Sequence, residues 1–459
     1  MFRNQHMIHA ISLACTLILV ACGAGGGGAS TSGTANNTIP TTVQAVVTFL
    51  DTKTLAGTFA YYRDGSVNTP VSYMYARDIN KDGVDEVFFV AFESQPNTQA
   101  NYSNTSIHIF GWENNVFKEI TSTWLPGTSN QVEGVGDLVF GDFNGDGKID
   151  VFLSAYTDMD FDVNAYALMN TGSSFTKVSL GLARWQHAVA SADVNRDGFD
   201  DVIVAGYSGN SPQYMGSATG LVPYSGMVGS SGVAVGDFLG TGTAQAVFVD
   251  ASTNGGADSF IYTMTINNVA RQITFTKTVV LPAPRLLATE DTTNRSHDIR
   301  TRAVDFDSDG RLDIVIFSYK ANYARSLLET EYKSEIQFLR NTGNGVFVDV
   351  TDTIRSGYDT TGYLGYYPEF RDFNGDGRLD LFLSQPDYFS SRAHKSTTLL
   401  IQQANGTYKD TGKSDLSNAV GYGGQGLLAK GPAGKTYLVT EAPWARTSFT
   451  TVYIQPVNF

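Results

Sequence analysis

The sequence predicts an all-β fold, a seven-bladed β-propeller of four-stranded blades that is closed by an N-terminal strand. Three observations lead to this prediction: an acidic nonapeptide that recurs along the chain, short β-rich runs on both sides of each copy, and a second strand pair in each unit. Successive copies start 44 to 68 residues apart, a period that suggests propeller blades. Four strands joined by short turns make up such a blade.

The recurring nonapeptide is clearest in DFNGDGKID. Its oxygen-bearing side chains stand at positions one, three, five and nine, and Gly stands at position six. Five copies keep this pattern, and they begin at Asp78, Asp142, Asp193, Asp305 and Asp372. A sixth copy, DFLGTGTAQ from Asp237, keeps the shape of the turn but has lost most of the acids.

The residues around each nonapeptide indicate that it joins two strands. Runs such as VFLSAY and IVIFSY follow the loops, and VGDLVFG and HAVASA precede them. Farther along, segments such as SIHIFGWENNVFKEIT and EIQFLRNTGNGVFVDVT place Asn and Gly between two β-rich runs. These residues supply the positive φ that tight hairpins need, so each unit is predicted to contain four strands.

The end of the chain predicts an incomplete seventh unit. GQGLLAKGPAGKTYLVTEA supplies two strands around an acid-free loop, and TTVYIQPVNF supplies a third. The isolated segment GTFAYYRDG, from Gly57, is similar to the last-strand segment GTYKDTG, from Gly406. We therefore expect the N-terminal strand to complete the last blade, because closing the ring removes open sheet edges.

The five acidic loops in register make the chain similar to the FG-GAP or VCBS-repeat propellers of integrin α-subunit heads and of many bacterial surface proteins. The resemblance covers roughly residues 57–459. It implies the same propeller fold that the strand pattern predicts.

The acidic loops are predicted to hold about five structural Ca²⁺ ions. Calcium takes six to eight oxygen ligands at about 2.3 to 2.6 Å, and Gly at position six permits the sharp turn that gathers them. Solvated Asx-type turns are the alternative, because Asp, Asn and Gly favour turns in any case. Five copies with the same four oxygen positions favour the metal sites over this alternative.

The predicted ligands are the side chains at positions one, three, five and nine and the carbonyl at position seven. They are Asp78, Asn80, Asp82, Val84, Glu86, Asp142, Asn144, Asp146, Lys148, Asp150, Asp193, Asn195, Asp197, Phe199, Asp201, Asp305, Asp307, Asp309, Arg311, Asp313, Asp372, Asn374, Asp376, Arg378 and Asp380. The sixth copy is expected to hold no metal, because Leu239 and Thr241 replace its acids.

The acidity of the chain comes from these loops. Their predicted ligand positions hold 16 carboxylates, and the net charge of the whole chain is −14. The charge therefore gives no information about a cationic partner. The negative net charge does argue against a nucleic-acid partner, because nucleic-acid binding depends on Lys and Arg side chains at the phosphates.

The N-terminal 22 residues are predicted to be a lipoprotein signal peptide. Their apolar run, residues 8–20, is too short to span a bilayer comfortably. LVAC, which ends at Cys22, resembles the lipobox whose cysteine is acylated; an ordinary cleaved signal peptide is the alternative. By the same resemblance, Gly23 favours the outer membrane. We expect a lipid-anchored protein of the bacterial cell envelope, periplasmic or surface-exposed.

The rest of the chain is expected to form two parts. Residues 23–42 are rich in Gly, Ser and Thr and predict a flexible tether. Residues 43–459 hold all the repeats and predict the propeller. Apart from the lipid anchor, no segment is predicted to enter the membrane.

Candidate ligand-binding residues precede the innermost strands of three units, on the face opposite the acidic loops, where propellers usually meet their ligands. Aromatic groups flanked by Arg, His and acids suit sugar rings. The alternative is that these aromatics pack between blades and the charges are ordinary rim residues. The candidates are Arg184, Trp185, His187, His297, Asp298, Arg300, Tyr363, Tyr366, Tyr367 and Glu369.

Three functions remain open at this point. The first is a binding or adhesion module for an extracellular glycan or protein, the second a polysaccharide lyase or glycosidase with a Tyr or His base beside Arg, and the third a scaffolding role in the envelope. No spacing signature of nucleophile, base and orienting group occurs, and His108 lies within an alternating strand. We therefore predict no catalytic residues and favour the binding module, although propellers host many functions.

Overall fold

A computed structural model of the chain describes most of the predicted propeller. Residues 46–459 form one compact unit. The predicted signal peptide and tether lie outside the described residues. The described residues are 48–49, 54–60, 70–93, 105–157, 161–207, 211–249, 259–283, 285, 294–322, 333–356, 367–384, 397–411, 426–442 and 449–459.

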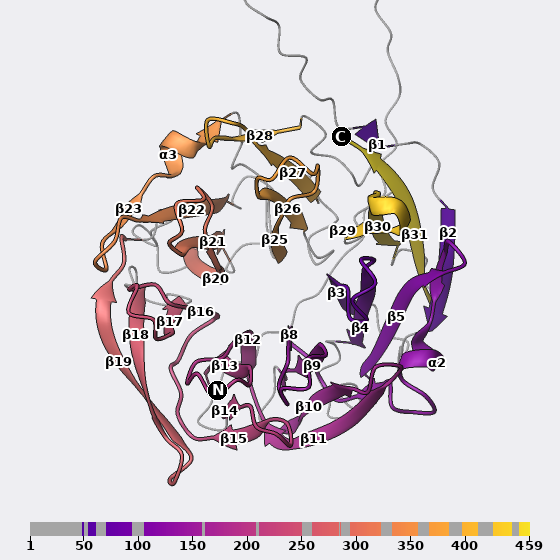
Figure 1. The fold of residues 1–459 in the computed structure, drawn as a ribbon, viewed down its shortest axis with the longest axis horizontal. Coiled ribbons are helices and arrows are strands. Elements are labelled where there is room, and N and C mark those ends of the chain that lie inside the picture. Colours follow the sequence, from indigo (N-terminus) through magenta and orange to yellow (C-terminus); the bar gives the residue numbers. More distant parts are fainter. Residues whose placement is uncertain are drawn as a thin grey trace, which may run out of the picture. The chain divides into compact units, whose positions relative to one another are not determined.

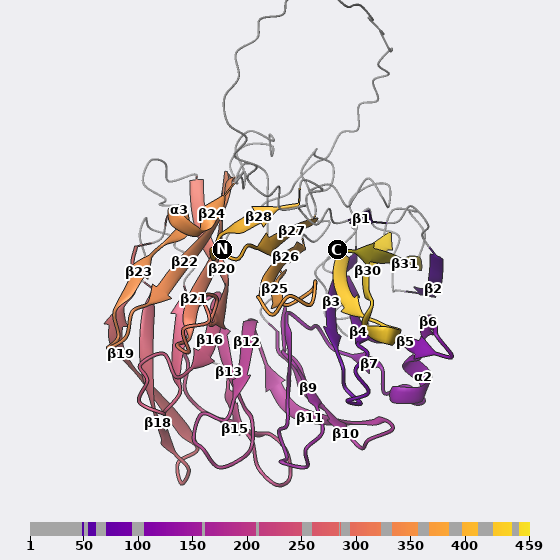
Figure 2. The same ribbon diagram turned by 45° about the horizontal axis from the view of Figure 1, so that its top comes forward.

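Seven small antiparallel sheets form a ring, which confirms the predicted seven-bladed β-propeller (Figure 1). Four of the sheets have four strands, and three have an added fifth strand. The strand that precedes the first loop of each blade (β3, β8, β12, β16, β20, β25 and β29) lies innermost, around a central axis that Figure 2 shows from an inclined view. Blades are numbered below in chain order.

Blades 1 to 3 follow one another without crossovers. Blade 1 consists of β3 (Pro70–Arg77), β4 (Glu86–Glu93), β5 (Thr105–Glu113) and β6 (Val116–Glu119), with the short helix α2 (Thr121–Trp124) and the added strand β7 (Gln131–Val132). Blade 2 consists of β8 (Leu138–Gly141), β9 (Asp150–Leu153), β10 (Val163–Asn170) and β11 (Phe175–Ala183). Blade 3 consists of β12 (Gln186–Ala192), β13 (Asp201–Gly206), β14 (Gln213–Met215) and β15 (Val222–Tyr224).

Blades 4 to 7 complete the ring. Blade 4 consists of β16 (Gly232–Gly236), β17 (Gln245–Val249), β18 (Phe260–Asn267) and β19 (Gln272–Val280). Blade 5 consists of β20 (Asn294–Val304), β21 (Asp313–Asn322), β22 (Lys333–Asn341) and β23 (Phe347–Asp349), followed by α3 (Thr351–Ile354). Blade 6 consists of β24 (Arg355–Ser356), β25 (Tyr367–Arg371), β26 (Asp380–Ser384), β27 (Thr397–Gln402) and β28 (Tyr408–Asp410). Blade 7 contains β29 (Gly426–Lys430), the 3₁₀ turn η4 (Pro432–Gly434), β30 (Thr436–Ala442) and β31 (Phe449–Asn458).

The core lies between neighbouring blades. The second strand of a blade is covered on both faces, and β9, β13 and β17 are buried along their whole length, as their continuous apolar runs predict. Aromatic rings join adjacent sheets, with ring centroids 4.8 Å apart for Phe152 and Tyr214 and 4.7 Å apart for Trp112 and Tyr437. No helix in the described part of the chain is long and apolar enough to cross a membrane.

The N-terminal strand completes the last blade, as predicted. The strand β2 (Thr54–Ala60) pairs antiparallel with β31, with Gly57 opposite Val452 (Figure 1, indigo beside yellow). A second short strand, β1 (Thr48–Phe49), also pairs with β31. The two ends of the propeller therefore share one sheet.

A buried acid joins blade 1 to blade 7 at its inner side. Asp85 exchanges two hydrogen bonds with the backbone of Lys430: the Asp85 N–H donates to the Lys430 carbonyl at 2.8 Å, and the Lys430 N–H donates to Asp85 Oδ2 at 2.6 Å. Arg371 of blade 6 donates to both Asp85 carboxylate oxygens, at 2.6 and 3.0 Å. The same contact occurs between blades 3 and 2, where Asp200 exchanges backbone and side-chain hydrogen bonds with the backbone of Asp142.

We predict that Asp85→Asn destabilises the propeller by about 3 kcal/mol or more, because it leaves the Arg371 guanidinium without its buried carboxylate partner. The loss is measured as a lower thermal unfolding temperature. Glu113→Gln is the control, because it breaks the half-exposed pair with Lys118 and should change stability by less than about 1 kcal/mol.

The double replacement Asp85→Leu with Arg371→Met should recover part of the loss, because it leaves no unpaired buried charge. Equal unfolding temperatures for Asp85→Asn and the control would contradict a role of Asp85 in closure.

Candidate functional site

The acidic loops share one hydrogen-bonded shape. In the second loop, Asp142 accepts the N–H groups of Asp146 and Gly147 through its two oxygens, at 3.0 and 2.8 Å, and Asn144 accepts the Asp146 N–H at 3.0 Å. Gly147 has a φ of 79°, which glycine adopts without the strain of a side chain. The first carboxylate thus fixes the turn in all five loops, where it accepts the N–H of the glycine at position six.

The acid at position nine ties each loop to the body of its blade. Asp150 is fully buried and accepts the Phe143 N–H at 3.1 Å and the Asn170 N–H, at the end of β10, at 2.7 Å. Burial, together with the charges of Asp146 and Asp142, raises the pKa of Asp150 to about 6.

The other four loops show the same effect at position nine. Burial raises the pKa of Asp201, Asp313 and Asp380 to about 7 and that of Glu86 to about 8. Each loop thus gathers carboxylates whose mutual repulsion a bound cation would relieve.

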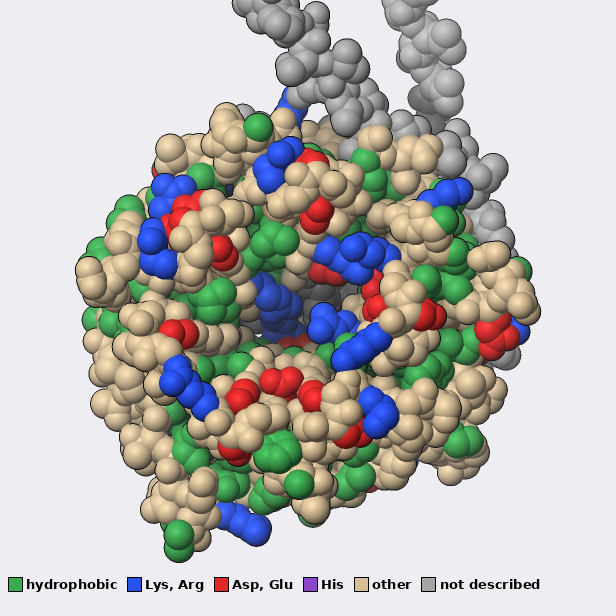
Figure 3. All heavy atoms as spheres, in the orientation of Figure 1, with side chains coloured by type: hydrophobic (Ala, Val, Ile, Leu, Met, Phe, Trp, Pro, Cys, Tyr) green, Lys and Arg blue, Asp and Glu red, His purple; other side chains and the backbone are tan. Residues whose placement is uncertain are grey.

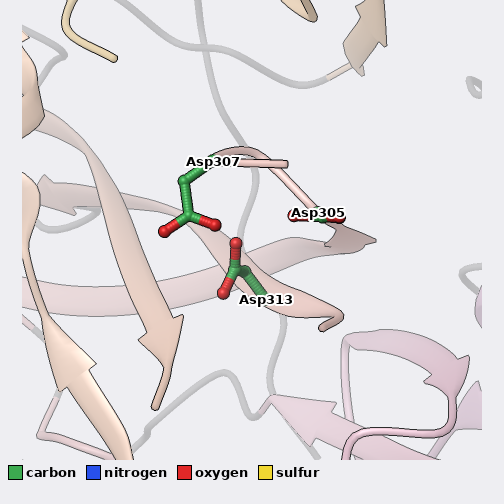
Figure 4. A group of neighbouring side chains, drawn as sticks. All are labelled: Asp305, Asp307 and Asp313. Carbon is green, nitrogen blue, oxygen red and sulfur yellow. The ribbon is translucent and has the colours of Figure 1, made fainter. Parts of the chain in front are cut away.

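The oxygen atoms of these loops could hold a metal ion. In the fifth-blade loop, carboxylate oxygens of Asp305, Asp307 and Asp313 all lie within 4.8 Å of one another, and Figure 4 shows Asp307 and Asp313 directed toward each other. Each carboxylate oxygen can accept more than one hydrogen bond or ligand, so the backbone contacts leave donor capacity for an ion. An all-oxygen set of this kind fits Ca²⁺.

The sixth loop, in blade 4, contains a neutral group where the other loops place their last acid. Asp237 keeps its bonds to the N–H groups of Thr241 and Gly242, at 2.9 and 2.5 Å. The Gln245 side chain accepts the Leu239 N–H at 3.0 Å through Oε1. Its Nε2 donates to Thr241 Oγ1 at 3.2 Å and to the Thr243 carbonyl.

The amide of Gln245 therefore satisfies atoms at positions five and seven, which are predicted to face the ion in the acidic loops. The sequence indicated that acids were missing from this loop but not that Gln245 would replace their contacts.

A second site is a cavity of about 720 Å³ lined by residues of blades 1, 2, 5, 6 and 7, on the side of the acidic loops. Lys and Arg side chains gather at the central opening in Figure 3. Four basic and three acidic side chains line this axial cavity: Arg77, Lys81, Arg302, Arg371, Asp78, Asp85 and Glu369. Tyr75, Phe140, Pro368 and Phe370 add a partly apolar wall.

The charged groups of the axial cavity are unevenly paired. Arg371 is held by Asp85 and lies 3.7 Å from Glu369. Among the described residues, Arg302 donates only to backbone carbonyls, to Pro368 at 3.2 Å and to Thr301 at 3.0 Å. Burial lowers the pKa of Arg302, and burial raises the pKa of Glu369 to about 7.

Of the predicted ligand residues whose side chains the structure describes, one lines the axial cavity. Glu369 lines it, and Arg300 precedes Arg302 on β20. Arg184 instead pairs with Asp162 at 3.0 Å. Trp185 has a φ of 55°, an unusual backbone conformation for a bulky residue.

His187 lies in an aromatic stack. Its ring centroid lies 5.1 Å from that of Tyr156 and 5.0 Å from that of Tyr207, both edge-to-face. Arg300 donates to the His187 carbonyl at 3.2 Å. Burial, with the nearby charge of Arg300, lowers the pKa of His187 to about 4.

The structure does not describe the side chains of the remaining candidates. Tyr363 and Tyr366 lie outside the described residues. His297 and Asp298 lie on β20 and Tyr367 begins β25, and the structure describes only their backbone. The residues that the sequence did not predict are Tyr75, Arg77, Arg302 and Arg371. The sequence pattern that could have indicated them is charged residues at alternate positions of the innermost strands, as in Arg300 and Arg302.

We predict that Gln245→Leu destabilises the protein by about 1 to 3 kcal/mol, because it leaves the Leu239 N–H and the Thr243 carbonyl without their partner. Urea unfolding measures this loss. The difference in stability between the variant and the wild-type protein should be the same with and without EGTA, because this loop is expected to hold no metal. Gln272→Leu, at the exposed start of β19 in the same blade, is the control. If both variants unfold at the same urea concentration, the amide of Gln245 contributes nothing to the loop.

We predict that His187 reduces stability in acid. Its folded pKa of about 4 lies below the ordinary value of about 6.5, so the unfolded chain takes up a proton first as the pH falls. Stability is therefore retained above pH 6.5 and is lost between pH 6.5 and 4. His187→Phe should lack this loss, which is on the order of 1 to 2 kcal/mol between pH 7.5 and 5.

Urea unfolding of both proteins at each pH measures the difference. Between pH 7.5 and 9 the difference should stay constant, because the imidazole is neutral in both states. A constant difference down to pH 5 would contradict a buried neutral His187.

The comparisons with known proteins agree with this architecture. The model of the FG-GAP-like repeat matches residues 78–153, 142–204 and 305–383. Each matched segment begins with the first residue of an acidic loop. No curated protein sequence matches the chain.

Several solved structures are distantly similar. One described as a glycoside hydrolase has 9% identity and a TM-score of 0.36, covering 90% of this chain and 92% of its own. A mutant of B. megaterium levansucrase has 10% identity and a TM-score of 0.33, with coverages of 77% and 87%. A mutant of levansucrase from Bacillus subtilis has 11% identity and a TM-score of 0.25, with coverages of 75% and 89%.

Likeness at these values carries no argument about activity or ligand. The repeats and the ring of sheets do establish the architecture: the chain is a seven-bladed β-propeller that carries three FG-GAP-like repeats.

Proposed function

We propose that this propeller is a calcium-stabilised binding module of the bacterial cell envelope, which holds an extracellular glycan or protein group. The observation that carries the binding role is the axial cavity, whose 720 Å³ falls within the range of small-ligand sites. Its lining combines apolar side chains with convergent charged groups, a mixture typical of such sites.

The proposed calcium sites are supported by the donor sets of the five acidic loops. When bound, Ca²⁺ would supply positive charge that offsets the repulsion between the loop carboxylates. The chain's own residues fix the loops by hydrogen bonds from the backbone to the position-one and position-nine acids. The ion would add stability to a turn that is already formed.

The anchoring part of the proposal rests on the sequence. Acylation of Cys22 would attach the protein to the membrane, most consistently the outer membrane, and residues 23–42 would separate the propeller from it. The propeller would then be available for adhesion or for an envelope scaffold.

The described residues favour binding over the alternative of a lyase or glycosidase. Tyr75 lines the axial cavity with Arg302, but burial and the hydrogen bond to Asp137 raise its pKa well above 10. A general base needs a pKa near the working pH. The ring of His187 packs edge-to-face against two tyrosine rings, and its pKa of about 4 is too low for a general base at neutral pH.

We predict that EGTA lowers the thermal unfolding temperature markedly and that added Ca²⁺ restores it. Each site held at a hundred times its Kd adds about 2.7 kcal/mol to stability. Asp146→Asn, which removes one ligand charge, should weaken the response to calcium, and Mg²⁺ should replace calcium poorly. An unchanged melting curve in EGTA would refute the calcium sites.

A glycan array with the calcium-loaded protein tests the binding role, because glycan binding would support it and no binding would favour a protein partner. Incubation with acidic polysaccharides tests the enzyme alternative. Absorbance from newly formed unsaturated sugars would replace the binding proposal with a lyase.

A further inference from the structure

We propose that the axial cavity binds the carboxylate of an acidic sugar, with Arg302 and Arg77 as its cationic partners. This inference rests on the proposed binding function and specifies its ligand. It follows from three features of the cavity: the pairing of its charges, their number, and the shape of the site.

The pairing of charges leaves two guanidinium groups available. Arg302 has no carboxylate within ion-pair distance among the described residues, and its Nη2 makes no hydrogen bond to them. Arg77 is exposed and donates no hydrogen bond to a described residue. The Arg302 side chain is half-buried, and a partly desolvated guanidinium without a carboxylate in direct contact is unfavourable. An anion that enters the cavity would therefore gain a charge-assisted contact.

The number of charges favours a single carboxylate over a doubly charged phosphate. Asp85 already neutralises Arg371, and Asp78 is turned into its own loop by bonds from the N–H groups of Asp82 and Gly83. Glu369 remains beside Arg371 at 3.7 Å. These acids would repel a dianion more strongly than a monoanion. A guanidinium also matches a carboxylate in two parallel hydrogen bonds.

The shape of the cavity favours a small saccharide over a protein surface. A stable protein interface buries about 800 Å² on each partner and is broad, whereas this site is a concave hollow among inner strands. Phe140, Pro368 and Phe370 give it an apolar wall beside the charged groups, and sugars combine apolar ring faces with hydrogen-bonding rims.

Calorimetric titration of the full, calcium-loaded protein with digalacturonate tests this inference. We expect binding of digalacturonate and none of its neutral dimethyl ester, in which both carboxylates are esterified. Arg302→Gln and Arg77→Gln should each raise the Kd about tenfold, the loss expected for one charge-assisted hydrogen bond. Arg271→Gln, on the exposed turn of blade 4, is the matched control, because it removes one positive charge far from the cavity.

Arg302→Gln also loses backbone contacts, so its folding is checked by thermal unfolding. The Arg77 side chain makes no such contacts with the described residues, and its variant keeps the test decisive if Arg302→Gln fails to fold. Equal binding of the dimethyl ester, no binding of digalacturonate, or equal losses in Arg271→Gln and Arg77→Gln would overturn the inference. Competition by inorganic sulfate as strong as by galacturonate would replace the acidic sugar with a free anion.

The effect of EGTA on the unfolding temperature distinguishes a failure of this inference from a failure of the proposed function. If EGTA lowers the unfolding temperature but digalacturonate does not bind, the acidic-sugar inference fails and the calcium-stabilised module stands. If EGTA has no effect, the calcium part fails whatever the saccharide result.

Discussion

Closure of the ring between blades 1 and 7 is the constraint on which the other features depend. Each blade buries its sheet only against two neighbours, so an open ring would expose two apolar faces. Two interactions close it: β2 pairs with β31, and Asp85 bonds to Lys430, which lies 345 positions later in the chain. Such distant contacts form only after a large loss of chain entropy. The same closure brings Arg77, Arg302 and Arg371 of three blades to one axial cavity.

The acidic loops and the axial cavity make opposite use of charge. In the loops, buried acids such as Asp150 have raised pKa values because burial disfavours their charge and several carboxylates share a small volume. In the cavity, the half-buried guanidinium of Arg302 makes no ion pair with a carboxylate among the described residues. Both arrangements carry an electrostatic cost in the isolated chain, which a ligand of the opposite charge would reduce.

The fold was predictable because its signals are local and repeated. Alternation around each nonapeptide gave the strands, and the similarity of the segments at Gly57 and Gly406 gave the closure by β2. Two-residue strands such as β1 and β24 carry no periodic pattern and were not predicted.

The candidate site was less predictable. Whether Arg302 points to the axis or to the next blade depends on the tilt and register of β20, which no local pattern determines. The role of Gln245 was also missed, because a lost acid gives no indication that an amide takes over its hydrogen bonds. His187 was predicted to contact a ligand, and in the structure its ring packs between Tyr156 and Tyr207.

The amide of Gln245 has a consequence for the ring as a whole. Blade 4 keeps Asp237 in its first turn but has the neutral amide of Gln245 in place of the last acid, and blade 7 has an acid-free turn around η4. These two blades divide the circumference into an arc of three acidic blades and an arc of two. If the acidic loops hold calcium as proposed, ion depletion would weaken the two arcs and spare the blades between them. The propeller would then lose rigidity in the two acidic arcs only. The axial cavity, lined by residues of blades 1, 2, 5, 6 and 7, would span both arcs, so its shape would depend on the ion concentration.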